Sequence, residues 1–138
     1  MTAKTISILI LTCGILGLVA IRAQSRPAAG DKLTESEASR LAREINTAEA
    51  SLFMAKEGNH QYVSLAQLLE SPVAKKHIEI PIALNDAASG EARGYLLSLI
   101  ASADGKHYLL EVAPHECGPA FFSSDAAVVY PAKALGCP

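Results

Sequence analysis

The chain has 138 residues, of which 50% are hydrophobic and 19% are charged, and its formal net charge is −2 at pH 7. This length predicts one globular domain. A slightly acidic chain without a run of like charges lacks the basic surface that DNA- and RNA-binding proteins use. We therefore expect no nucleic-acid partner.

The N-terminal residues predict export. Lys4 precedes an uncharged, mostly apolar run over residues 5–21, and Arg22, Ala23 and Gln24 follow it. A basic start, a short apolar run and small residues at the cleavage point are typical of a secretory signal peptide. We expect cleavage after Ala23, which lowers the net charge of the remaining chain from −2 to −4 because Lys4 and Arg22 are removed.

The domain organisation follows from this signal. Residues 1–23 are expected to be the signal peptide, residues 24–33 a linker and residues 34–138 the folded domain, exported to the periplasm or the extracellular space. The apolar run of 17 residues is close to the shortest that spans a bilayer. The alternative is therefore an inner-membrane protein that keeps residues 1–21 as its anchor.

A disulfide is expected between Cys117 and Cys137. The chain has three cysteines, and Cys13 lies within the signal. An isolated pair in an oxidising compartment is typical of a structural disulfide. The spacing of the two cysteines matches neither a CxxC redox motif nor a four-ligand zinc site.

A long helix is expected to begin after Thr34. Thr34 and Glu37 form a T-x-x-E capping box, and Gly58 is placed to end the helix about six turns later. Charged residues, including Glu44 and Glu49, are expected on its solvent side. The apolar stripe that would pack on a sheet is Ala38, Leu41, Ile45, Ala48, Leu52 and Ala55.

The middle of the chain predicts little regular structure. Ser64 can cap a second, short helix that ends near Pro72. Residues 78–82 alternate isoleucine with other residues and predict an extended edge segment, because Pro81 cannot donate to a strand ladder. Residues 85–93 are rich in Ala, Ser and Gly and predict a loop.

A β-hairpin is the clearest local pattern. Two strand-like runs, residues 94–103 and 106–113, flank Asp104-Gly105. This dipeptide is typical of a type I′ turn, in which both central residues have positive φ. The side chains expected on the helix side of the hairpin are Leu97, Leu99, Tyr108, Leu110 and Val112.

The last elements complete the expected fold class. Phe121 and Phe122 begin a short apolar element, and residues 127–130 predict a final strand. We expect an α+β domain in which a long N-terminal helix packs on a small antiparallel sheet of about four strands, closed by a C-terminal disulfide. Phe121 and Phe122 are expected in its core.

No motif for catalysis or for a cofactor is present in the sequence. The four histidines have no metal-binding spacing, and there is neither a GxSxG motif nor a glycine-rich phosphate loop. We therefore expect no catalytic, cofactor-binding or metal-binding residues, and no enzyme activity. A small secreted hydrolase or ligand-binding domain that uses His115 and Glu116 stays open as an alternative.

Several short segments follow one another in an order found in a known family. They are Ile45–Ala50 (INTAEA), Tyr62–Leu68 (YVSLAQL), Gly94–Leu99 (GYLLSL), Asp104–Tyr108 (DGKHY), Ala113–Pro114, Cys117–Gly118 and Phe121–Phe122. Over about residues 36–137, the chain resembles type IV pilins and pseudopilins, and in particular small bacterial pilin-like proteins. The apolar run lacks the acidic residue and the cleavage site that pilins carry.

The resemblance implies a pilin-like domain with an interaction or assembly role. Its expected partners are proteins, and the resemblance implies components of a pilus or of a secretion system. The alternative implied by the same resemblance is a membrane-anchored minor subunit of a type IV pilus or of a type II secretion apparatus. The expected binding surface is the outer face of the sheet or the C-terminal loop that the disulfide bounds.

Overall fold

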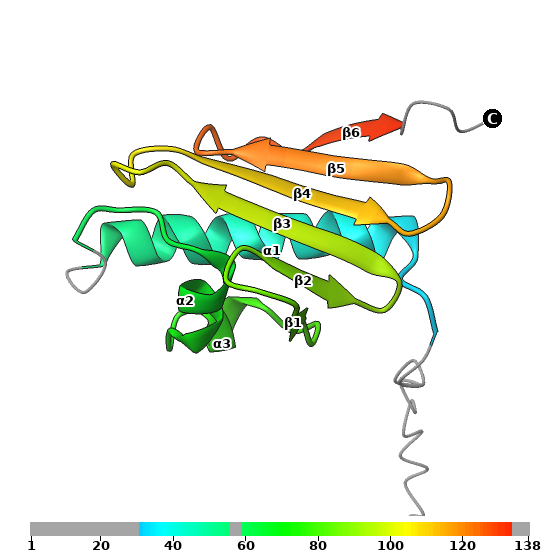
Figure 1. Ribbon diagram of the computed structural model, residues 1–138, viewed down its shortest axis with the longest axis horizontal. Helices are drawn as coiled ribbons and strands as arrows, with labels where there is room; N and C mark the ends of the chain where they lie inside the picture. Colours follow the sequence, from blue (N-terminus) through cyan, green and yellow to red (C-terminus); the bar gives the residue numbers. More distant parts are fainter. Residues whose placement is uncertain (1–30, 56–58, 134–138) are drawn as a thin grey trace, which may run out of the picture.

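The computed structural model describes residues 31–55 and 59–133. In this part of the chain, one antiparallel sheet of six strands is flanked by helices on a single face (Figure 1). The strands are β1 (Ala83–Leu84), β2 (Ser89–Ala92), β3 (Tyr95–Ala101), β4 (Tyr108–Pro114), β5 (Pro119–Ser124) and β6 (Tyr130–Lys133). The helices are α1 (Glu35–Met54), α2 (Leu65–Glu70) and α3 (Ala74–His77).

The prediction of a long helix on a sheet of about four strands is wrong. The sheet has six strands, which lie in the order β1-β2-β3-β4-β5-β6, so the described part of the chain contains more sheet than the sequence indicated. One unexpected strand, β2, falls in residues 85–93, where a loop was expected. Its residues have little intrinsic preference for a strand, and pairing with β3 decides their conformation.

Gly90 shows why this weak segment becomes a strand. A Cβ atom at Gly90 would lie 2.9 Å from the carbonyl oxygen of Ala83 and 2.9 Å from Ile82 Cγ2. The absence of a side chain therefore lets β1 and the chain before it approach β2 closely. In the sequence, Gly90 was one of the Ala, Ser and Gly residues from which a loop over residues 85–93 was expected.

The start of α1 agrees with the sequence. The Thr34 Oγ1 accepts a hydrogen bond from the Glu37 backbone N–H, and the Glu37 carboxylate accepts one from the Thr34 N–H at 2.8 Å. This capping box is the one that was predicted. The second helix also begins at its predicted cap, because Ser64 and Gln67 form the same reciprocal pair.

The cap of α1 is joined to the turn between β2 and β3. Glu37 accepts a hydrogen bond from the Arg93 guanidinium at 2.7 Å, and Leu33, which is buried, donates its backbone N–H to the Arg93 carbonyl. The Thr34 N–H, and then Arg93, lower the pKa of Glu37 to about 2. Leu33, the last residue of the expected linker, is therefore already packed into the folded domain.

The predicted type I′ turn at Asp104-Gly105 is wrong. Strand β3 ends at Ala101 and β4 begins at Tyr108, and in this connection only Gly105 has positive φ. A two-residue hairpin turn with positive φ at both positions lies instead at Arg93-Gly94, between β2 and β3. Asp104 instead accepts hydrogen bonds from the Ser102 hydroxyl and the Lys106 N–H, which favours the longer loop.

The face assignment of this hairpin is confirmed. Leu97 pairs with Val112, and Leu99 pairs with Leu110. All four side chains are buried, together with Tyr108, on the side where the helices lie. The apolar stripe of α1 packs on this face near β4 and β5, while α2 covers β2 and β3 (Figure 1).

The last predicted strand is displaced along the chain. Residues 127–130 were expected to form it, but β6 begins at Tyr130 because Ala127 has φ 58° and belongs to a turn.

No helix of the described residues is long and apolar enough to cross a membrane. The expected signal peptide or anchor lies outside the described residues.

The capping box can be tested with two threonine variants. Thr34→Ala removes the acceptor for the Glu37 N–H and is expected to lower the free energy of unfolding by about 1 kcal/mol. Thr47→Ala is the control, because Thr47 lies mid-helix and donates only to the Arg43 carbonyl. Urea unfolding measures both, and equal losses in the two variants would contradict the assigned cap.

Candidate functional site

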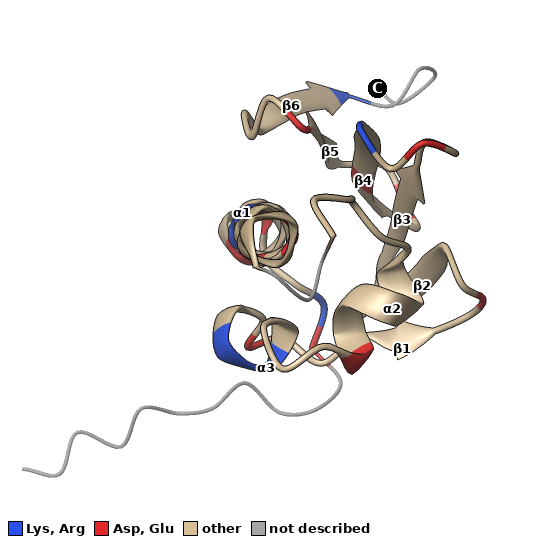
Figure 2. Ribbon diagram, turned by 90° about the vertical axis from the view of Figure 1, so that its left-hand side faces the viewer, with Lys and Arg blue, Asp and Glu red and all other residues tan. Residues whose placement is uncertain are grey.

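The outer face of the sheet is not covered by any described helix. Figure 2 shows all three helices on the same side of the strands. Because side chains alternate along a strand, the residues next to the buried ones in each strand point the other way. Leu96, Ile100 and Leu109 lie on this outer face with 42%, 57% and 53% of their surface exposed.

These apolar side chains share the outer face with others on β5 and β6, and they lie around Ser98 and Glu111. Ile100 pairs directly with Leu109 across β3 and β4. Phe122 pairs with Tyr130 across β5 and β6 and lies on the same outer side, where Tyr130 is 57% exposed. We call this set, Leu96, Ile100, Leu109, Phe122 and Tyr130, the outer patch.

Phe121 and Phe122 have different environments. The sequence interpretation placed both in the core. Phe121 pairs with Val112 and is buried, whereas Phe122 pairs with Glu111 and is only half-buried. The prediction is therefore right for Phe121 and wrong for Phe122, because neighbouring residues of a strand point to opposite faces.

The charges around the outer patch are acidic. Glu111 lies in the middle of this face, between Ser98 and Phe122 in the strand register, and Glu91 lies on it in β2. Within residues 83–133, none of the strand positions on this face is Lys or Arg. Apolar residues beside a few charges of one sign are typical of a protein-binding surface.

His115 and Glu116, the residues of the alternative hydrolase or ligand-binding site, contact different partners. His115 Nε2 lies 3.1 Å from a carboxylate oxygen of Glu91, while Glu116 pairs with Lys32 at 2.7 Å. The two side chains thus have separate, largely exposed partners. Among the described residues, no group of three His, Cys, Asp or Glu side chains could hold a metal ion.

The predicted disulfide stays a prediction. Cys117 lies in the connection between β4 and β5. Cys137 lies outside the described residues, so the expected pairing with Cys117 cannot be followed in the fold.

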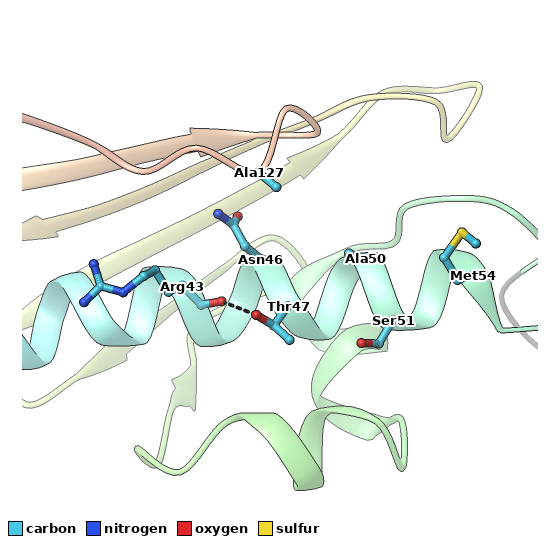
Figure 3. Close-up of a pocket in the computed structure, with 7 residues that line it drawn as sticks. All are labelled: Arg43, Asn46, Thr47, Ala50, Ser51, Met54 and Ala127. Carbon is cyan, nitrogen blue, oxygen red and sulfur yellow. Dashed lines mark hydrogen bonds between the residues drawn. The ribbon is translucent and has the colours of Figure 1, made fainter.

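An open hollow lies between α1 and the connection from β5 to β6. It has a volume of about 540 Å³. Figure 3 shows that the Asn46 side chain points from α1 toward Ala127, and both residues line the hollow. Thr47, Ala50 and Ser51 also line it, so small and hydroxyl side chains dominate. A second hollow of about 560 Å³ extends past Arg43 toward the start of α1.

A chain of buried hydrogen bonds lies behind the first hollow. The Tyr108 hydroxyl donates to Asn46 Oδ1 at 2.7 Å, Asn46 Nδ2 donates to the Ser123 hydroxyl at 2.6 Å, and that hydroxyl donates to the Val128 carbonyl at 2.9 Å. The chain links α1 to β4, β5 and the following turn. Each of these side-chain polar atoms has a hydrogen-bond partner, so the chain of hydrogen bonds stabilises the fold and leaves none of these polar groups free for a ligand.

Glu49 is the buried residue that the sequence analysis missed. It was expected on the solvent side of the helix but is fully buried. The spacing contained the signal, because Glu49 follows Ile45 by four residues and precedes Leu52 by three, which places it on the apolar stripe. Burial raises the pKa of Glu49 to about 7.

Tyr108→Phe tests the buried chain of hydrogen bonds. Removing the hydroxyl leaves the buried Asn46 Oδ1 without its donor, and we expect the free energy of unfolding to fall by about 1–3 kcal/mol. Tyr130→Phe makes the same change at an exposed side chain and is expected to cost less than about 0.5 kcal/mol. Urea unfolding of both variants measures the difference, and matching losses would show that the Asn46 contact contributes nothing.

Comparison of this chain with protein-family models, with curated proteins and with solved structures finds no match.

Proposed function

We propose that this chain is an exported, non-catalytic domain that binds a protein partner through the outer patch. The observation that carries the proposal is the pairing of exposed Ile100 and Leu109 on an uncovered sheet face, near the loop that joins β3 and β4. The three further apolar side chains of the outer patch lie on the same face, around Ser98 and Glu111. Burial of such side chains in a complex is favourable at about 25 cal/mol per Å² of apolar surface.

The charge of the face defines the chemistry of the partner. Glu111 and Glu91 lie beside the outer patch. Among the described strand residues that face outward, none is Lys or Arg. A partner that brings apolar side chains to Ile100 and Leu109 and a basic side chain to Glu111 complements this surface. Complementary charge speeds association and selects among partners.

The export part of the proposal is supported by the N-terminal sequence. Lys4, the apolar run over residues 5–21 and Ala23 follow the pattern of a signal peptide. The second candidate function, a membrane-anchored subunit of a pilus or secretion apparatus, is favoured by the pilin-like segments and by the same apolar run. The two candidates differ in whether residues 1–21 are retained.

Intact mass distinguishes these two candidates. The full-length sequence is expressed in an exporting bacterial host, and the protein is purified without reductant. We expect a mass that corresponds to residues 24–138, which rises by two hydrogens on reduction because the Cys117–Cys137 bond opens. A membrane-bound product that retains residues 1–23 would reject the cleaved signal and favour the anchored subunit.

Site-specific photo-cross-linking tests the binding face. A photoreactive phenylalanine analogue is placed at Ile100 or Leu109 in the exported protein, and at Met54 as the control. Met54 is 73% exposed but lies on α1, on the other layer of the domain. We expect an adduct with a second protein from the two sheet positions and none from Met54.

The adduct identifies a partner whose affinity can then be measured. Ile100→Asp is expected to raise the dissociation constant for the purified partner by about tenfold or more, since it replaces one side chain of the exposed apolar pair with a charge. Met54→Asp should leave the constant within about twofold, as is usual for substitutions outside the contact. An adduct of twice the mass of the chain would indicate self-association, and an adduct only from Met54 would place binding on the helix layer; either result rejects the proposal.

A further inference from the structure

Glu49 is a buried acid without a cationic partner in the described structure. Its side chain is fully buried, and its Oε1 has no hydrogen-bond partner. The other oxygen, Oε2, accepts one long hydrogen bond of 3.4 Å from the backbone N–H of Val63. An ionised carboxylate normally needs several donors or a cation when it is buried, so this environment favours the neutral acid.

The donor to Glu49 belongs to segment 59–64, which follows α1 and leads to α2. This segment has no helix or strand, and its first residues, Asn59 and His60, have φ of 50° and 54°. Asn59, His60 and Gln61 are exposed, and Tyr62 and Val63 are half-buried. The segment is therefore a thin cover between part of the core and solvent.

Ring contacts and hydrogen bonds hold the segment in place, among them the His60 ring against Phe53 at 5.8 Å and the Lys106 ammonium donating to the His60 carbonyl at 3.5 Å. The Tyr62 ring stacks on Phe53 at 4.6 Å and meets the Tyr108 ring edge-on at 4.8 Å. The Tyr62 N–H donates to the Gly105 carbonyl at 2.8 Å. Together with the bond from Val63 to Glu49, these contacts connect the segment to α1, β4 and the turn between β3 and β4.

Burial is what opposes the ionisation of Glu49. The titratable groups that interact with it are Tyr62 from the segment and Tyr108 from β4, and both are neutral around neutral pH because burial, together with the charges of Glu49 and Asp125, raises the pKa of each hydroxyl. His107 lies 3.1 Å from Asp125 and is largely exposed. Within the described residues, the Val63 N–H is the one group that favours the ionised form of Glu49.

We propose that the Glu49 carboxyl is a pH-dependent latch on segment 59–64: the neutral acid keeps the segment closed over the core, and ionisation opens it so that water reaches the carboxylate. The opened segment releases Tyr62 from Phe53 and Tyr108. This exposes the polar chain that begins at Tyr108. The outer patch lies on the opposite face of the sheet, so the latch is independent of the proposed partner binding.

The direction of the pH effect follows from the raised pKa. Burial raises the pKa of Glu49 from 4.5 to about 7 in the closed form. In the opened form water reaches the carboxyl, so its pKa returns toward the ordinary value. Between these two values the opened form loses its proton while the closed form keeps it, so the closed form loses stability as the pH rises and then stays at its lowest stability above pH 7.

Amide hydrogen exchange measures the opening directly. Protection factors of the Tyr62 and Val63 amides, which correct for the intrinsic pH dependence of exchange, are compared at about pH 4.5 and about pH 8. These values bracket the two pKa values. In the wild-type protein we expect the protection factors to fall by about tenfold or more at the higher pH. The difference between the pKa values of Glu49 in the closed and opened forms sets the upper limit of this change, and that limit is larger than about tenfold. In Glu49→Gln, protection should be independent of pH.

Glu44→Gln is the matched control for the loss of an acid from α1. Glu44 lies on the same helix, 3.5 Å from the Arg40 guanidinium, and accepts the Glu79 N–H at 3.2 Å. This variant should retain the wild-type loss of protection at high pH. A wild-type segment with equal protection at both pH values, or a Glu49→Gln segment that still opens, would overturn the proposal.

A second measurement uses only the wild-type chain, in case Glu49→Gln does not fold. The side-chain carboxyl carbon of Glu49 is followed by NMR across the same pH range. A titration midpoint close to neutral pH that coincides with the loss of Tyr62 and Val63 protection supports the latch. A midpoint below about pH 5, the ordinary range for a glutamate, overturns it.

Discussion

The burial of one stripe of α1 against one face of the sheet is the constraint on which the rest of the domain depends. Ala38, Leu41, Ile45 and Ala48 are completely buried there, with Leu97, Leu99 and Leu110 from the strands. Small alanines let the helix lie close to the strands, so apolar contact is continuous along it. The capping box at Thr34 and the Arg93 contact then hold the start of this helix next to the turn between β2 and β3.

This one-sided packing leaves two surfaces with different chemistry. On the inner side, polar groups near the end of α1 must be satisfied within the protein, and Asn46, Tyr108 and Ser123 satisfy one another. Glu49 lies nearby without such a network, which is why its proton is linked to the position of segment 59–64. On the outer side, Ile100 and Leu109 stay in contact with solvent unless a partner covers them.

Elements with strong local patterns could be predicted from the sequence. The capping box of α1, the Ser64 cap of α2 and the faces of β3 and β4 follow from the identity and spacing of residues close together in the chain. The core position of Phe121 was predicted, but the outward position of Phe122 was not. Glu49 could have been placed in the core from its position between Ile45 and Leu52, yet its charge led to the opposite interpretation.

The sequence by itself determined where α1 and α2 begin, which side chains of the central hairpin share a face, and the signal-like character of residues 1–23, because each depends on neighbouring residues. Only the tertiary structure decided that residues 89–92 form a strand, that the hairpin turn with positive φ at both positions lies at Arg93-Gly94 and not at Asp104-Gly105, and that Glu49 has no cationic partner among the described residues. These features depend on pairing and burial between distant segments. A weak local preference is overridden when a neighbouring strand supplies the hydrogen bonds and a helix removes the water.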